Sequence, residues 1–444
     1  MTIGVKTVGN VGVIVNKGFE KAAVVQVREI LEDVKDVHVQ ETIVSFKPKT
    51  WDDIFRFVYK NQIANRIIYL IGEFDYETED ELIEGTHKII NEEDNESDDA
   101  LLKELILGNA DFRVSVRMDE HTDVTGTEAD IGGLLIDYAK TLGKELKVNL
   151  KNPVLNLYVY IYNSHAYIGI DLSDDLSKRD YKIFNNAVSL KGPTAFGLLM
   201  LAGYKPKDVY LNPCCYSGTI EIEAALYATQ LSPRFYNKSF PFMKFSTAAI
   251  VAMGDFDKFF EKIDNERIDN RSDKKSDKNA KLFSITGSDK LLSSITAATK
   301  NAKIAGVESI IDFRRIDFDW MDIKFEEDSV NKIITFIPGS SKHDKHLIKD
   351  FKQIFYQAEY ILKNSGKLVI MCLSKDLLIE SASEYFDVDH EVTVHSGGQV
   401  MHVLFFKRKN PKDLKSTKNP KSGAKPETDE SETIKSEVEV REGD

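Results

Sequence analysis

Cysteine is scarce in this chain, with 3 residues among 444, and two of them are adjacent at Cys214 and Cys215. So few cysteines cannot build the disulfide framework of a small secreted protein. They also lack the paired spacing of zinc ligands, and no histidine cluster completes such a site. The sequence therefore predicts a cytoplasmic protein that holds no metal.

Long apolar runs and an excess of positive charge are also missing. No segment approaches the ~20 apolar residues that a membrane helix needs, and the opening MTIGVKTVGN lacks the charged-then-apolar pattern of a signal peptide. The formal net charge of -13 argues against a strongly basic nucleic-acid-binding protein, but it leaves room for a local basic face. We therefore expect no membrane partner.

Two glycine-rich fingerprints are absent as well. The chain contains neither G-x-G-x-x-G, which binds dinucleotides, nor G-x-x-x-x-G-K-[ST], which cradles the phosphates of ATP. A dehydrogenase or an ATPase is therefore not expected.

The hydrophobic pattern divides the chain into four parts. Residues 1–75 alternate strands with helices and predict a small α+β domain, and residues 76–172 predict a second one with an acidic insertion. Residues 173–409 alternate helix with strand, the pattern of a mostly parallel α/β sheet, and contain a charged insertion. Residues 410–444 are low-complexity, first basic and then acidic, and predict a disordered tail.

A ligand anchor is predicted where the third part reads VYLNPCCYSGTIEIEAA. A short apolar strand is followed by the small turn residues Ser217, Gly218 and Thr219 and then by a helix. Backbone N–H groups and the helix dipole face a nucleotide-like ligand at such a turn. The bulky Tyr216 stands where this turn favours glycine.

Two acids end the strands that follow. Asp289 is placed to accept hydrogen bonds from ribose hydroxyls, and Asp317 is placed to accept the amino group of adenine. Each acid alone is explained equally well as a helix cap or a turn former. The small-residue turn and the two acids stand at three successive strand ends, and together they favour a site for a nucleotide-like ligand.

These motifs together identify a family. The chain resembles the THUMP-domain RNA methyltransferases, most closely those that act on the N2 amine of guanosine in tRNA. Their first cofactor motif, D-P-M-C-G-S-G-T-I-x-I-E-A-A, is matched here by N-P-C-C-Y-S-G-T-I-E-I-E-A-A at residues 212–225. Further matches are KRDYKIFNNAVSLKGPTAF at 178–196, the G-S-D…A-G-V pattern at 287–307, and K-N-P at 151–153. The resemblance covers the chain except the acidic stretch, the charged insertion and the tail.

The resemblance implies a fold, a cofactor and a partner. Residues 1–75 would form a ferredoxin-like domain, residues 76–172 a THUMP domain that grips the tRNA acceptor end, and residues 173–409 a Rossmann-like class I methyltransferase domain with a mostly parallel seven-stranded sheet. The implied S-adenosylmethionine-binding residues are Asn212, Cys215, Tyr216, Ser217, Gly218, Thr219, Asp289 and Asp317. The expected contacts to tRNA or another structured RNA are Arg113, Arg117, Lys151, Lys178 and Arg179, whose charge alone would indicate only a solvated surface.

The catalytic motif of active members is not matched. They end the fourth strand with N-P-P-Y, whose Asn side chain and Pro carbonyl accept the hydrogens of the amine while the aromatic ring stacks on the flipped-out base. This chain reads Phe336-Ile337-Pro338-Gly339. Sliding the alignment by one residue restores neither the amide nor the ring.

Three hypotheses follow from these departures. The first is an RNA-binding protein with a methyltransferase fold that no longer methylates guanosine. The second is an active S-adenosylmethionine-dependent methyltransferase in which Phe336 stacks on the base and carbonyls around Pro338 accept the hydrogens. The third is a non-catalytic assembly partner in a larger RNA-processing complex, with protein partners that the sequence does not identify.

Overall fold

A four-stranded antiparallel sheet begins the computed structural model, which describes residues 8–91, 100–118, 126–185, 189–268, 282–338 and 345–409. Its elements are β1 (Val11–Ile14), α1 (Glu20–Ile30), β2 (Lys35–Gln40), β3 (Ile43–Lys47), α2 (Trp51–Lys60) and β4 (Arg66–Asp75). The order β2-β3-β1-β4 with a β-α-β-β-α-β succession is the ferredoxin-like arrangement that was expected. The sequence analysis missed β2, because an exposed edge strand carries no run of apolar residues.

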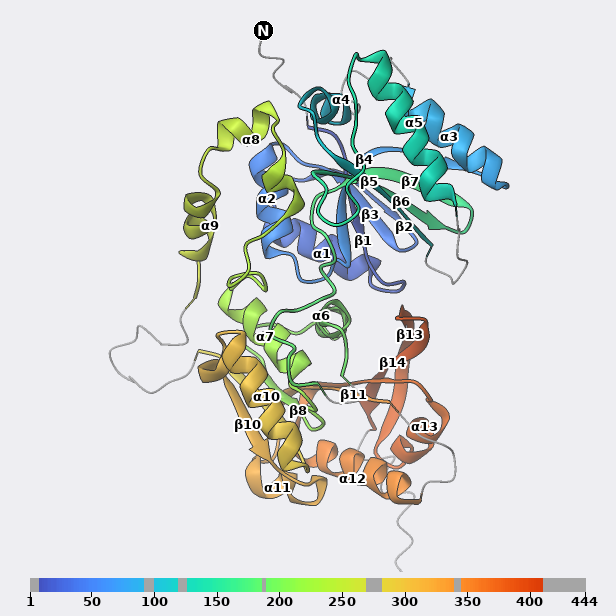
Figure 1. Ribbon diagram of the computed structural model, residues 1–444. Coiled ribbons are helices and arrows are strands. Elements are labelled where there is room, and N and C mark those ends of the chain that lie inside the picture. The colour runs from blue at the N-terminus through green and yellow to red at the C-terminus, as the bar shows by residue number, and fades with distance from the viewer. Residues whose placement is uncertain are drawn as a thin grey trace, which may run out of the picture. The chain divides into compact units, whose positions relative to one another are not determined.

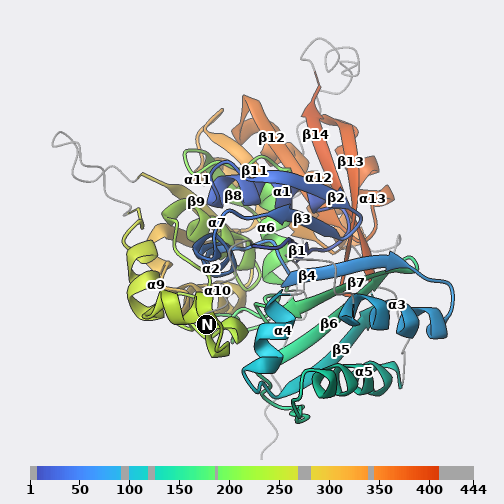
Figure 2. The ribbon, with the colours of Figure 1, turned by 90° about the horizontal axis from the view of Figure 1, so that it is seen from above.

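The next elements extend the same sheet. They are α3 (Glu79–Asn91), α4 (Ala100–Leu107), β5 (Phe112–Met118), α5 (Thr127–Thr141), β6 (Leu155–Tyr162) and β7 (His165–Asp171). Strands β6 and β7 form the expected hairpin, and its turn residues Asn163 and Ser164 both have left-handed φ angles. Strand β7 pairs with β4, so seven strands run in the order β2-β3-β1-β4-β7-β6-β5 (Figure 2). Two domains were expected, and they share one sheet.

This sheet is strongly rolled. Strands β2 and β7 are separated in the sheet by β3, β1 and β4, yet Tyr167 of β7 donates a hydrogen bond to Gln40 of β2. Tyr160 of β6 also donates to Thr42 at 2.7 Å. A separate small core of isoleucine, leucine and tyrosine side chains fills the concave side. That side is therefore closed by packing.

The second sheet follows the class I methyltransferase order. Its elements are α6 (Gly192–Leu201), β8 (Val209–Asn212), α7 (Thr219–Thr229), β9 (Ser284–Asp289), α10 (Leu292–Ile304), β10 (Ile311–Arg315), α11 (Met321–Lys324), β11 (Val330–Ile337), α12 (Lys345–Ile361), β12 (Leu362–Cys372), α13 (Asp376–Ala382), β13 (Phe386–Ser396) and β14 (Gln399–Arg408). The strand order is β10-β9-β8-β11-β12-β14-β13, with β14 antiparallel to both neighbours and the other pairs parallel. The mostly parallel seven-stranded sheet is confirmed.

An excursion after α7 returns to the N-terminal sheet. It contains the 3₁₀ turn η1 (Pro241–Lys244), α8 (Ala248–Met253) and α9 (Phe256–Asp264), and it lies beside α2 (Figure 1). The ring of Phe55 packs 4.7 Å from that of Phe242, and Tyr59 packs 4.5 Å from Phe260. The Tyr59 hydroxyl also donates to Asp264 at 2.6 Å. The excursion therefore covers the outer face of α2.

The described residues up to Arg408 form one compact unit. The predicted tail at 410–444, most of the acidic insertion and most of the charged insertion lie outside the described residues. Within the described residues, no helix has the length and apolarity to cross a bilayer, and no group of His, Cys, Asp and Glu side chains is arranged to hold a metal. The exact domain boundaries remain predictions.

Candidate functional site

The candidate site is the loop between β8 and α7. It lies beside the topological switch point of the sheet, which falls between β8 and β11. Asn212 accepts a hydrogen bond from the Cys214 N–H at 3.0 Å, and Cys215 donates its N–H to Ser288 at 2.8 Å. Gly218 has a φ of 80°, and a side chain there would meet Ala298 at 2.9 Å. Glycine is therefore required both by the backbone angle and by the close approach of α10.

Tyr216 also adopts a left-handed conformation in this loop, with a φ of 48°. Such an angle is uncommon for a residue with a side chain. Its N–H donates to Asp289 at 3.2 Å, and its ring lies 6.5 Å from that of Phe336. Burial raises the pKa of its hydroxyl, so the ring is a neutral group in the wall of the site.

Asp289 ends β9 directly beneath this loop and is only 6% exposed. One carboxylate oxygen accepts the Tyr216 N–H and the other accepts the Leu291 N–H at 2.8 Å. Burial raises the pKa of this carboxyl, and the backbone donors offset part of that shift. The Ser294 side chain also hydrogen-bonds to this carboxylate. Three donors therefore leave about one of its four acceptor positions for a ligand hydroxyl. Asp317 lies exposed just beyond the neighbouring strand β10.

Two cavities border the loop. The larger one, about 180 Å³, is lined by Pro213, Cys214, Tyr216, Asp289, Lys290, Leu291, Phe318, Ile337, Asp350, Phe351 and Ile354. The smaller one, about 10 Å³, is lined by Ser189, Leu190, Cys214, Cys215, Tyr216, Ser217, Thr219, Ile220 and Phe336. Cys214 and Tyr216 line both cavities. The smaller space is about the minimum that holds one water molecule.

The end of β11 presents little that could bind an amine. Phe336 is 5% exposed, so most of its ring is unavailable for stacking on a base. The Pro338 carbonyl already accepts the Leu373 N–H at 3.2 Å. Gly339 and the serines after it lie outside the described residues.

A buried acid supports the loop from below. Glu221 is fully buried in the first turn of α7, and a side chain at Gly287 would lie 3.0 Å from it. Neither of its carboxylate oxygens has a hydrogen-bond partner among the described residues. Burial raises the pKa of Glu221 to about 8, and the nearby Asn212 amide offsets the shift only in part. An Asp at position 212 would place a second buried carboxyl here.

The prediction that Arg179 contacts RNA is wrong. Its side chain is 1% exposed and forms a buried ion pair with Glu223 of α7 at 2.7 Å. It also donates to the Gln62 carbonyl at 2.7 Å, while Tyr181 donates to Glu223 at 2.8 Å. We call this group of Gln62, Arg179, Tyr181 and Glu223 the buried clamp. It joins the N-terminal sheet to α7, so the basic motif around residue 179 has a structural role.

The other predicted cations lie at the surface. Arg113 donates to the Leu150 carbonyl at 3.2 Å, which brings it beside exposed Lys151. Arg117, further along β5, pairs with Glu128 at 3.3 Å. Lys178 is 83% exposed and lies 3.7 Å from Asp175.

Lys244 of the excursion joins the cations at residues 113 and 151. It donates to the Asn152 side chain and lies 3.4 Å from the Pro153 carbonyl. The sequence analysis missed Lys244, because it comes from a segment about 90 residues away in the chain and only folding brings it there.

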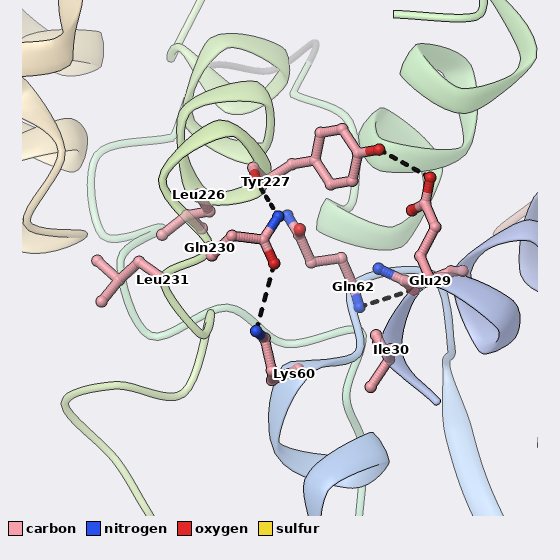
Figure 3. Close-up of a pocket in the computed structure, with 9 residues that line it drawn as sticks. Glu29, Ile30, Lys60, Gln62, Leu226, Tyr227, Gln230 and Leu231 are labelled. Atoms are coloured by element: carbon pink, nitrogen blue, oxygen red, sulfur yellow. Dashed lines mark hydrogen bonds between the residues drawn. The ribbon is translucent and has the colours of Figure 1, made fainter. Parts of the chain in front are cut away.

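A third cavity, of about 300 Å³, lies at the other end of α7 (Figure 3). Tyr227 donates to Glu29 at 3.0 Å, and Lys60 donates to Gln230 at 3.3 Å (Figure 3). Burial raises the pKa of Glu29 and lowers that of Lys60. These polar groups bond to one another, and the cavity is remote from the strand ends. It is therefore separate from the candidate site.

The strand order and the loop beside the β8–β11 switch point define a class I methyltransferase fold. The family described as "RMKL-like, methyltransferase domain" matches residues 179–402, half of the chain, and the THUMP domain matches residues 76–171. The chain belongs to the RMKL-like methyltransferase-domain family and carries a THUMP domain before that domain.

Relatives with curated names are similar to most of the chain. A protein of Methanocaldococcus jannaschii named tRNA (guanine(6)-N2)-methyltransferase is 29% identical over 68% of this chain and 77% of its own length. A protein of the same name from Archaeoglobus fulgidus is 26% identical over 66% of this chain and 68% of its own length. The crystal structure of a possible methylase from Clostridium difficile 630 covers 91% of this chain and 99% of its own, with a TM-score of 0.72 and 22% identity. The last likeness concerns the fold alone.

The sequence analysis missed the apolar walls of the larger cavity. Leu291 comes two residues after Asp289, and Phe318 directly follows Asp317. Their positions next to the strand-end acids could have predicted that they line the site. Phe351 and Ile354 come from α12, and no local pattern connects them with the loop.

Proposed function

We propose that this protein is a cytoplasmic tRNA-binding protein that does not transfer a methyl group to guanosine N2. One observation carries the proposal: among the described residues at the end of β11, through Pro338, there is neither a side-chain amide nor an accessible ring, and the Pro338 carbonyl is already bonded to Leu373. An exocyclic amine needs acceptors that aim its lone pair at the methyl donor. Without them, the transfer step lacks its positioning groups.

The THUMP domain and the names of the relatives support tRNA as the partner. Arg113, Lys151 and Lys244 offer neighbouring cations to phosphate groups, and Lys178 offers a further one. Such contacts give affinity and register without reading the sequence. Arg117 remains a proposed contact to RNA, although it forms an ion pair with Glu128.

S-adenosylmethionine is the cofactor that this family implies, and the residues fit only one part of it. Asp289 and the larger cavity suit its adenosine portion, and Asp317 directly precedes the lining residue Phe318. The smaller cavity, about 10 Å³, leaves no room for the methionine portion beside Tyr216, Ser217 and Thr219. The residues therefore do not fit the whole cofactor, and we assign no catalytic step to it.

The test combines RNA binding and turnover on one sample. The full chain is titrated with unmodified tRNA transcripts, and the same transcripts are incubated with labelled S-adenosylmethionine. The Methanocaldococcus jannaschii relative serves as the positive control. We expect saturable tRNA binding by this chain and methyl transfer only by the relative.

Each other outcome points to another hypothesis. Methyl transfer by this chain would overturn the proposal and favour an enzyme in which Phe336 and Pro338 form a replaced motif. Absence of tRNA binding by the isolated chain would also overturn it, and would favour an assembly partner that binds RNA only within a complex.

A further inference from the structure

We infer that the larger cavity beside Asp289 binds an adenine nucleoside that lacks an amino-acid tail, and that Tyr216 enforces this selection. The inference rests on the proposed function, because it takes the cofactor site to be altered rather than intact. It assigns a ligand to a site whose residues do not fit S-adenosylmethionine as a whole.

The walls of the cavity suit a flat aromatic base. Leu291 and Phe318 follow the adjacent strands β9 and β10, Ile337 ends β11, and Phe351 and Ile354 add two apolar side chains from α12. Burying a planar base among such groups is favourable, and a few placed polar groups then fix its orientation. The volume of about 180 Å³ is small, which favours a nucleoside over a longer ligand.

The polar groups suit a sugar rather than a phosphate. Asp289 holds its carboxylate at the floor of the cavity, with both oxygens oriented by backbone N–H groups. Asp350 and Lys290 also line the cavity. Asp317 interacts electrostatically with Lys290. Lys290 already pairs with Asp350 at 2.9 Å. The carboxylates accept hydroxyl hydrogens, but they repel a phosphate.

The route toward the smaller cavity is closed by several contacts. The Tyr216 N–H is bonded to Asp289, and Tyr216 lines both cavities. On the far side, Ser189 lies 2.7 Å from the Ser217 hydroxyl and 3.3 Å from that of Thr219. A methionine tail attached to the ribose would have to displace this packing. A nucleoside without a tail would not.

The experiment is a calorimetric titration of the full chain with adenosine, adenosine monophosphate and S-adenosylmethionine. We expect adenosine to bind at least tenfold more tightly than either of the others. Tyr216→Gly should raise the affinity for S-adenosylmethionine at least tenfold relative to that for adenosine. Tyr216→Phe keeps the ring and should behave as the wild type.

Two further variants test the assignment of the cavity. Asp289→Asn should weaken adenosine binding at least tenfold, with folding checked by thermal unfolding. Leu291→Asp changes an exposed wall residue, so it keeps the fold, and it should weaken adenosine binding by a similar factor.

Equal or tighter binding of S-adenosylmethionine by the wild type would overturn the inference, and so would the absence of adenosine binding. Adenosine binding that survives Leu291→Asp unchanged would place the ligand elsewhere and overturn it too. None of these results bears on tRNA affinity, which is measured separately, so failure here is distinguishable from failure of the proposed function.

Discussion

At the scale of single residues, the amide of Asn212 and the buried acid Glu221 are best considered together. Asn212 replaces the aspartate of the family motif, and Glu221 lies fully buried nearby without a hydrogen-bond partner among the described residues. Two carboxylates at this depth would repel each other, whereas an amide and a protonated carboxyl are compatible. The replacement of aspartate by Asn212 is therefore explained by the nearby Glu221.

This pair predicts an unusual dependence of stability on pH. The raised pKa, about 8 against an ordinary 4.5, means that folded Glu221 keeps a proton that the unfolded chain has released. The free energy of unfolding should therefore fall as the pH rises between these two values. Glu221→Gln should remove that slope and stabilise the protein at pH 8.5 by about 1–3 kcal/mol. Thermal unfolding at pH 5 and 8.5 measures the effect.

Glu308→Gln is the matched control, because Glu308 is exposed and should leave the slope unchanged. A slope that persists unchanged in Glu221→Gln would show that other groups cause it and would contradict the assignment to Glu221.

At the scale of elements, the buried clamp decides how α7 is held. Arg179 bonds to Glu223 on α7 and to the carbonyl of Gln62, which follows α2. Removing one partner of a buried ion pair leaves the other charge unpaired. Arg179→Ala should therefore lower the free energy of unfolding by about 3–5 kcal/mol, measured in denaturant.

Lys178 provides the comparison, since it is the preceding residue and points into solvent. Lys178→Ala should change the free energy of unfolding by less than about 0.5 kcal/mol. If Arg179→Ala instead kept full stability and lost tRNA affinity, the original RNA-contact prediction would be restored.

At the scale of the whole molecule, the proposed RNA surface combines residues from separate parts of the chain. Lys151 precedes β6 and Lys244 lies in the excursion, and both are near Asn152. Lys151→Gln and Lys244→Gln should each weaken tRNA binding at every sequence tested. Each should also reduce the slope of log affinity against log salt by just under one, because one fewer counterion is released.

Lys349→Gln on α12 is the control and should leave the salt slope unchanged, because Lys349 is exposed outside this surface. An unchanged slope for both Lys151 and Lys244 would place the RNA on another face.

The sequence predicted the architecture better than it predicted the site. Strand and helix periodicity, with the family motifs, predicted the second sheet and most strands of the first. The polar edge strand β2, the β4–β7 pairing that joins the two expected domains in one sheet, and the excursion onto α2 carried no local signal. The loop and Asp289 lie together as their strand-end positions implied. The burial of Arg179 and the placement of the Tyr216 ring depend on contacts between distant segments, which one sequence does not reveal.

The pairing of β4 with β7 has a consequence for synthesis on the ribosome. Strand β4 ends at Asp75, and its partner β7 begins at His165, about 90 residues later. At ~5–20 residues per second, the ferredoxin-like part emerges with an open, largely apolar strand for several seconds or more. Nascent chains in this interval are exposed to strand addition from other chains. Chaperone demand should therefore peak before the THUMP hairpin is translated.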